Sequence, residues 1–153
     1  MRWVTRRQIH VNRTATAWLI RRFLDPEGEI LFLEPEEVAE VQRLEGAVGF
    51  DAPGSQYPHQ DALGRCSFEQ LVQERLGQDA ALRRLARIVH DADFPEEPGT
   101  QLEAVGLWAI SQGFTEVGRD DSDIVARASF LYDSLYAHLQ RSQVPGLRGP
   151  SHA

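Results

Sequence analysis

The chain has 153 residues, of which 42% are hydrophobic and 25% charged, as in an ordinary soluble protein of one globular domain. No apolar run approaches the roughly 20 residues that span a bilayer, and the first residues lack the apolar core of a signal peptide, so we expect a cytoplasmic protein without a membrane partner. A formal charge of -7 disfavours direct nucleic-acid binding. Cys66 is the single cysteine and there is no lysine, which excludes an internal disulfide, a CxxC zinc site and a lysine Schiff base.

The first fifty residues alternate between predicted strands and predicted helices. The expected strands are 2–6, 30–33 and 47–50, and the expected helices are 13–24 and 35–44. Asn12 is the expected N-cap of the first helix, and Asp25-Pro26 its end. The continuous apolar run at 30–33 favours a strand buried on both faces. The β-α-β-α-β order predicts a small parallel sheet.

The second half of the chain is predicted to be helical after an irregular loop at 51–66. The expected helices are 68–76, 80–92, 101–112 and 123–141, with Ser67, Asp79, Thr100 and Ser122 as N-caps. Aromatic residues on these helices, namely Trp108, Phe130, Tyr132 and Tyr136, are expected in the core. The predicted fold is therefore α/β in the α+β sense, one domain over 1–142, followed by a disordered tail at 143–153.

The predicted loop gathers side chains that commonly bind metal ions. Asp51, His59, Cys66 and Glu69 lie within nineteen residues of one another. These are ligand types for zinc, iron or manganese. Glu69 falls in the first turn of the next helix, so its carboxylate is expected to point back toward the loop. The alternative is structural: a surface histidine, a buried thiol and a carboxylate that favours the helix dipole.

A second group stands at the end of the helix predicted over 80–92. His90 and Asp93 are three residues apart and share one helix face. His90 and Asp91 are adjacent, as in the HD phosphohydrolase motif, although a lone His-Asp pair is weak evidence. A histidine placed favourably at a helix C-terminus is the simpler interpretation.

Arginines on the first predicted helix form a third group. Arg13, Arg21 and Arg22 are candidates for binding an anion, since a guanidinium grips oxyanions through two parallel hydrogen bonds. A solvated helix face is the alternative.

Three segments resemble one protein family. They are His10-Val11-Asn12-Arg13-Thr14-Ala15-Thr16-Ala17-Trp18-Leu19-Ile20-Arg21-Arg22-Phe23-Leu24-Asp25-Pro26, then Phe50-Asp51-Ala52-Pro53-Gly54 with His59 and Cys66-Ser67-Phe68-Glu69, then Ile88-Val89-His90-Asp91-Ala92-Asp93. The chain resembles the C-terminal domain of ChrB proteins, which implies a stand-alone chromate-resistance domain over about 2–140. The family pattern has an Ala-Cys pair where this chain has Ala15-Thr16, so a redox role for that cysteine is not expected here.

The combined hypothesis is a metal- or oxyanion-binding protein of the chromate response. His59, His90 and Asp93 are the expected metal ligands, completed by Glu69 or Cys66, for Zn²⁺, Mn²⁺ or Fe²⁺. Arg13, Arg21 or Arg22 would meet a small oxyanion such as chromate. Two alternatives stay open: a metal-dependent hydrolase or redox enzyme using the same residues, and a non-catalytic interaction domain. The sequence also leaves open whether the chain forms a homodimer.

Overall fold

The computed structural model describes residues 1–142. In chain order the elements are β1 (Arg2–Arg6), α1 (Val11–Leu19), the π-helix η1 (Ile20–Leu24), β2 (Glu29–Leu33), α2 (Pro35–Glu45), β3 (Val48–Gly49), α3 (Ser67–Arg75), α4 (Ala80–Asp93), α5 (Glu103–Gln112), α6 (Phe114–Val117) and α7 (Asp121–Ser142). The predicted α+β class is confirmed. The predicted tail at 143–153 lies outside the described residues. No helix within 1–142 is long and apolar enough to cross a membrane.

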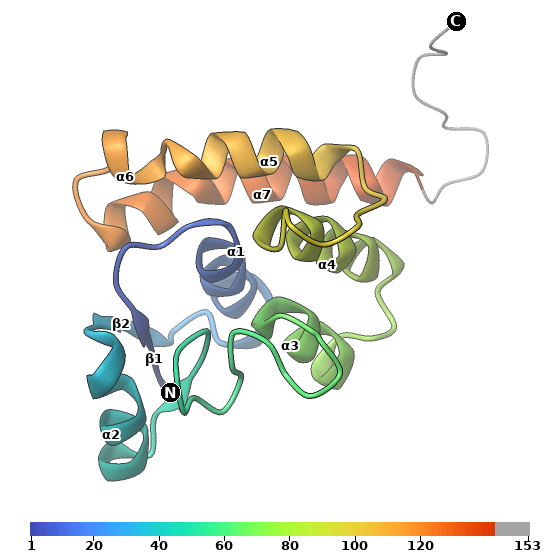
Figure 1. Ribbon diagram of the computed structural model, residues 1–153. Helices are drawn as coiled ribbons and strands as arrows, with labels where there is room; N and C mark the ends of the chain where they lie inside the picture. Colours follow the sequence, from blue (N-terminus) through green and yellow to red (C-terminus); the bar gives the residue numbers. More distant parts are fainter. Residues whose placement is uncertain (143–153) are drawn as a thin grey trace, which may run out of the picture.

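The sheet is small and parallel, with the order β2-β1-β3. Right-handed crossovers place α1 and α2 on opposite faces, because β2 and β3 lie on opposite sides of β1. Alternation along β1 follows this arrangement. Trp3 faces the main core, whereas Val4 faces a smaller cluster beside Val38 of α2. Figure 1 shows α2 on the outer side of the strands and α1 on the inner side.

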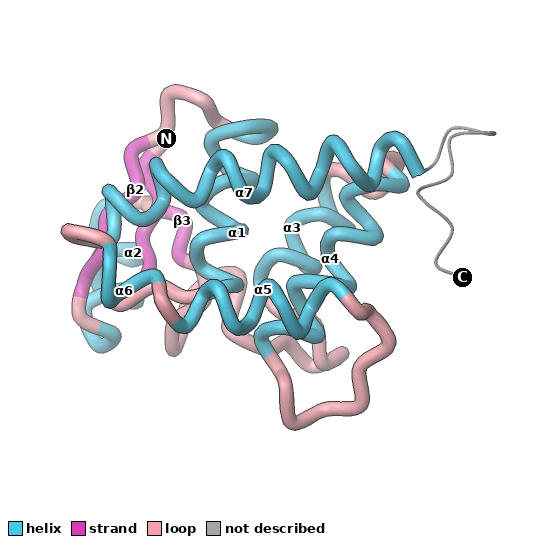
Figure 2. The backbone as a smooth tube through the Cα atoms, turned by 90° about the horizontal axis from the view of Figure 1, so that it is seen from above, coloured by secondary structure: helices cyan, strands magenta, loops and turns pink. Residues whose placement is uncertain are grey.

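Helices supply the rest of the core. Seen in Figure 1, α5, α6 and α7 form an upper layer over α1 and α4, and α3 lies below α4. Figure 2 looks down on this layer and shows α5 and α7 as separate, roughly parallel rods. Leu82, Leu85 and Val89 form the predicted apolar stripe of α4, and all three are fully buried. The end of α4, which carries His90, is thus held between two layers.

Several local predictions were wrong, either in where an element begins and ends or in how deeply its residues are buried. β2 is an edge strand and only Ile30 is buried in it, so the run at 30–33 is not covered on both faces. The third strand is limited to Val48–Gly49. Some predicted N-caps were also wrong. Asn12 and Ser122 lie inside their helices, because α1 begins at Val11 and α7 at Asp121, and Thr100 lies outside α5, which begins at Glu103.

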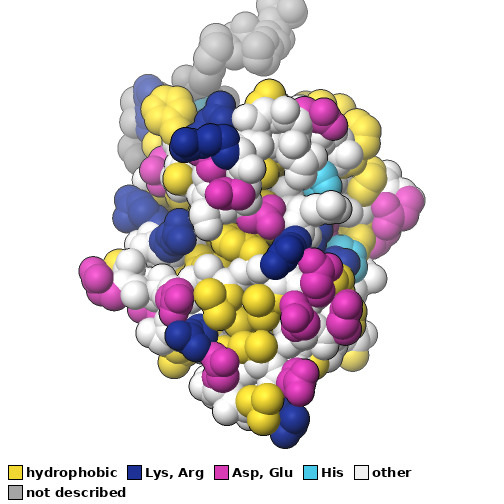
Figure 3. Space-filling model, turned by 90° about the vertical axis from the view of Figure 1, so that its left-hand side faces the viewer, with side chains coloured by type: hydrophobic (Ala, Val, Ile, Leu, Met, Phe, Trp, Pro, Cys, Tyr) yellow, Lys and Arg dark blue, Asp and Glu magenta, His cyan; other side chains and the backbone are white. Residues whose placement is uncertain are grey.

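The aromatic prediction was correct for two residues and wrong for the other two. Tyr132 and Tyr136 are buried, and both pack near Trp18. Trp108 and Phe130 are 41% and 81% exposed. Figure 3 shows the face that carries α2, β2 and α6, where acidic and arginine side chains are interspersed around a central hydrophobic group.

Candidate functional site

The carboxyl edge of the parallel sheet is where the candidate site begins. β1 ends at Arg6, and Asp51 follows directly after β3 and Phe50. Parallel strands present their carboxyl ends at one edge, so these two side chains meet there. α1 starts five residues after β1 and brings Arg13 to the same edge. Topology therefore places charged groups from separate segments around Asp51.

Asp51 is the centre of the first cluster, which we call the Asp51 cluster and which consists of Arg6, Arg13, Asp51, His59 and Asp93. Its carboxylate side chain is only 3% exposed. His59 Nδ1 lies 2.7 Å from one carboxylate oxygen, and Arg13 Nε lies 3.1 Å from the other. Arg6 donates from Nε to the Asp51 backbone carbonyl at 2.7 Å. Asp51 has a positive φ of 48°, a conformation that Asp and Asn tolerate better than most residues.

Asp93 is the carboxylate of the Asp51 cluster whose buried oxygen has no hydrogen-bond partner within residues 1–142. Its side chain is 13% exposed, and its buried Oδ2 accepts no hydrogen bond from the described residues. The nearest cation is His59, with Nδ1 at 3.6 Å. Burial and the neighbouring charge of Asp51 raise the pKa of Asp93 to about 7. The hydrogen bond to Asp51 raises the pKa of His59. Asp93 therefore exchanges a proton near neutral pH.

A second group, the Cys66 cluster, consists of Cys66, Glu69 and His90. It is built on the N-terminus of α3, where Cys66 is the N-cap and Glu69 the third residue of a capping box. The sequence had placed this box one residue later, at Ser67 and Gln70. The Cys66 backbone N–H donates to Glu69 Oε1 at 2.9 Å, so the carboxylate turns back toward the loop as expected.

His90 reaches the Cys66 cluster from the last turn of α4. Its Nδ1 lies 2.5 Å from Glu69 Oε1. One ligand atom from each of Cys66, Glu69 and His90 lies within 4.8 Å of the other two. The thiol is completely buried, while the other two side chains are about one-fifth exposed. Three different donor atoms, S, O and N, thus converge at a site with an opening to solvent.

In the absence of another cation, the electrostatics of the Cys66 cluster favour the protonated forms of Cys66 and His90. Burial, reinforced by the nearby Glu69 carboxylate, raises the pKa of the Cys66 thiol well above its usual value. Burial alone would lower the pKa of His90, but the hydrogen bonds and charges of Glu69 and Glu97 together outweigh it, so the pKa is raised. The thiol is therefore not an activated nucleophile, which needs a lowered pKa. A bound cation would reverse both effects by replacing the protons.

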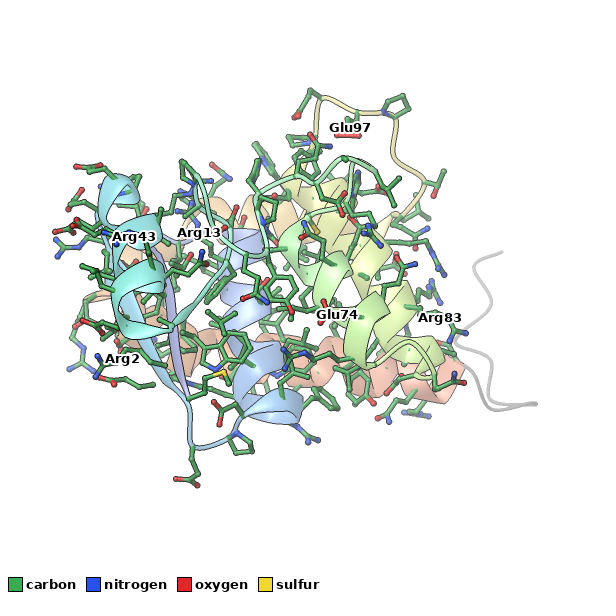
Figure 4. The ribbon with its side chains drawn as sticks, turned by 90° about the horizontal axis from the view of Figure 1, so that it is seen from below. Arg2, Arg13, Arg43, Glu74, Arg83 and Glu97 are labelled. Carbon is green, nitrogen blue, oxygen red and sulfur yellow. The ribbon has the colours of Figure 1, made fainter. Side chains whose placement is uncertain are left out.

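The two clusters adjoin through Phe94. The rings of His59 and His90 lie 5.0 and 4.8 Å from its ring, measured between centroids. Glu97, on the loop after α4, approaches His90 Nε2 at 3.4 Å. Figure 4 labels Glu97 near the top of that view and Arg13 to its lower left. The loop at 51–66 and the end of α4 therefore form one continuous polar region.

The structure brings together some of the predicted ligands and separates others. Cys66, Glu69 and His90 share one cluster, while His59 and Asp93 share the adjacent one. Arg13 belongs to the Asp51 cluster. Arg21 and Arg22 are exposed on η1 at the other end of the first helical segment, where Arg22 lies 3.6 Å from Asp133. The three arginines do not form one anion site.

Asp91 has a structural role and does not pair with His90 in the way that the HD phosphohydrolase motif would require. Its Oδ2 accepts hydrogen bonds from the backbone N–H groups of Thr100 and Gln101, both at 2.9 Å. It thereby ties the loop after α4 to the helix. Within the described residues, His90 and Asp91 do not converge on a common point.

Sequence reasoning missed two participants and gave a third a different role. Arg6 was expected at the end of the first strand and in the basic group before Arg13, which could bind an oxyanion, but not as a partner of Asp51. Glu97 and Phe94 were given no role. The relevant signal for Arg6 was its position at the end of a central parallel strand, where functional side chains gather. Glu97 and Phe94 carried no signal, because their roles depend on the path of the loop after α4.

Asn12 holds the first residues of α3, whose N-terminus carries Cys66 and Glu69, through hydrogen bonds. Fully buried, it donates from Nδ2 to Ser67 Oγ at 2.8 Å and accepts from the Phe68 backbone N–H at 3.3 Å. Asn12→Ala leaves these groups unpaired, so we expect a loss of about 1–3 kcal/mol in the free energy of unfolding, measured by urea denaturation. Gln112→Ala on exposed α5 should change it by less than about 0.5 kcal/mol. Equal effects in both variants would contradict the structural role of Asn12.

Comparison with known proteins identifies the family. The profile described as "ChrB, C-terminal domain" matches residues 3–139. Protein ChrB of Cupriavidus metallidurans is 37% identical over 138 residues, which cover 89% of this chain and 40% of that protein. The chain thus spans about two-fifths of the length of that relative. No solved structure matches it. The chain belongs to the family of ChrB C-terminal domains.

Proposed function

We propose that this domain binds one divalent metal ion through Cys66, Glu69 and His90. The observation that carries the proposal is the convergence of a thiol, a carboxylate and an imidazole within 4.8 Å of one another. Mixed S, N and O donors suit Zn²⁺ or Fe²⁺ better than Mg²⁺ or Ca²⁺, which prefer oxygen alone. His90 Nδ1 and Glu69 Oε1 lie 2.5 Å apart, at hydrogen-bond distance, and a metal ion would take the place of the proton between them.

Three protein ligands leave a coordination position open on a tetrahedral ion. A small oxyanion would fit that role, in keeping with a cytoplasmic part in the chromate response that the family suggests. An anion site built on arginines alone has less support. Arg13 is committed to buried Asp51, and Arg22 lies beside Asp133.

Residues next to the metal site would support it without being its main ligands. His59 and Asp93 are candidates for further ligands, but His59 Nδ1 is engaged by Asp51. Glu97 beside His90 Nε2 would orient the imidazole, as carboxylates commonly do for metal-bound histidines.

The test is elemental analysis of freshly purified protein beside His90→Ala. We expect close to one equivalent of a transition metal in the parent chain and at least a tenfold lower content in the variant, because the imidazole is one of three ligands. His138→Ala, on α7, is the matched control and should retain the metal. Circular dichroism checks that both variants are folded. Undiminished metal content in folded His90→Ala would rule out this assignment.

A further inference from the structure

The outward face of α5 is unusually apolar for a helix at the surface. Figure 1 places α5 at the upper edge of the molecule, and Figure 2 shows it unobstructed from above. Its inner side buries Ala104, Leu107 and Ser111. Its charged side chain, Glu103, is already paired with Arg84 at 3.0 Å. An exposed helix normally carries charged residues on its outer side.

Large apolar side chains cover this outer face. Leu102, at its N-cap, is 89% exposed, Val105 73%, Ile110 51% and Trp108 41%. At helical spacing Leu102 and Val105 lie along the centre of the face, with Trp108 and Ile110 on its two flanks. Single exposed apolar residues are ordinary, but a continuous set on one short helix marks an interaction site.

Gly106 supports the same conclusion. It lies between these side chains on the outer face, and a Cβ added there would meet no atom within 4 Å. Packing inside the domain therefore does not require glycine at this position. Glycine in a helix interior costs about 1 kcal/mol relative to alanine. A close approach by a second helix would account for it.

The area of the face fits a second copy of this chain. Scaled by their exposed fractions, the four side chains leave on the order of 300 Å² of apolar surface on this helix. A standard dimer interface buries about 800 Å² on each partner, of which about 65% is apolar in homodimers. The helix alone thus supplies more than half of the apolar area required. The face carries projecting side chains and, at Gly106, a position without a side chain that can receive those of a second copy. Such a surface is complementary to itself about a two-fold axis.

We propose that two copies of the chain associate through the outward faces of α5, packed against each other about a two-fold axis near Gly106. This dimer does not depend on the metal site. Because the face is uncharged, its association depends weakly on salt.

Sedimentation velocity over a range of protein concentrations tests the dimer, with Val105→Glu and Gly106→Leu as variants. The parent chain should sediment as a dimer at micromolar concentration, and each variant should weaken association at least tenfold. Gly106→Leu should at the same time raise the melting temperature of the monomer, since leucine favours the helix and has room. A higher melting temperature would show that the weaker association comes from loss of the contact between the helices and not from unfolding of the monomer.

Phe130→Glu is the matched control, because Phe130 is 81% exposed but lies on α7. It should leave the dimer intact. A parent chain that stays monomeric at every concentration overturns the proposal. So does a dimer that Val105→Glu and Gly106→Leu leave unchanged.

Discussion

Asp51→Asn is expected to lower the free energy of unfolding by about 3–5 kcal/mol, because it removes the counter-ion of Arg13 and Arg6 while leaving both guanidinium groups in place. Asparagine keeps the shape of the side chain and tolerates the positive φ, so the change isolates the charge. Urea denaturation should show a lower midpoint with an unchanged slope. Such a loss is a large part of the 5–15 kcal/mol that holds a typical domain folded.

Two comparisons make the Asp51 result specific. Glu29→Gln breaks an exposed contact with Arg2 and should cost less than about 1 kcal/mol. Adding Arg13→Met to Asp51→Asn should recover part of the loss, because the buried cation is then gone. A loss below about 1 kcal/mol for Asp51→Asn would show that the buried charges do not depend on Asp51.

Asp93→Asn is expected to stabilise the domain at alkaline pH. The pKa of Asp93 is about 7 in the folded protein, against 3.8 for an unperturbed carboxyl group. The folded state therefore keeps a proton that the unfolded state has lost, and stability falls as pH rises from about 4 to about 7. The raised pKa of His59 acts in the same direction, since the stability it adds below its unfolded pKa is lost as pH rises through its folded pKa.

The measurement for Asp93 is the free energy of unfolding at pH 5 and pH 8, with metal removed by a chelator. The gain from Asp93→Asn should be larger at pH 8 than at pH 5 by about 2–3 kcal/mol. Glu40→Gln, on the exposed side of α2, should follow the parent protein at both values. A gain that does not change with pH would contradict the buried, proton-exchanging carboxyl group.

The sequence predicted the elements better than their ends and environments. Periodicity located the parallel sheet and the long helices, because one face of each is continuously apolar. The capping residues were less certain. Cys66 caps α3 in place of Ser67, since Ser67 is turned inward to Asn12, a contact between residues 55 positions apart. No local pattern reports such a contact.

The candidate site was predictable in composition but not in grouping. The predicted ligand set of His59, His90 and Asp93 required the loop to meet the end of α4, and it does. Spacing along the chain did not reveal that Phe94 separates His59 from His90, or that Asp51 binds both His59 and Arg13. The exposure of Trp108 on α5 was also missed, because an apolar helical stripe indicates burial without saying whether the cover comes from the same chain.

Reconstitution of the metal-free protein with Co²⁺ tests the proposed metal site most directly. Coordination by the Cys66 thiolate should produce a sulfur-to-cobalt absorption band in the near ultraviolet that saturates at one equivalent. Cys66→Ser should lose this band, and His90→Ala should weaken binding at least tenfold. The absence of any thiolate band at saturating Co²⁺, or a band that persists in Cys66→Ser, would contradict a metal ion held by Cys66, Glu69 and His90.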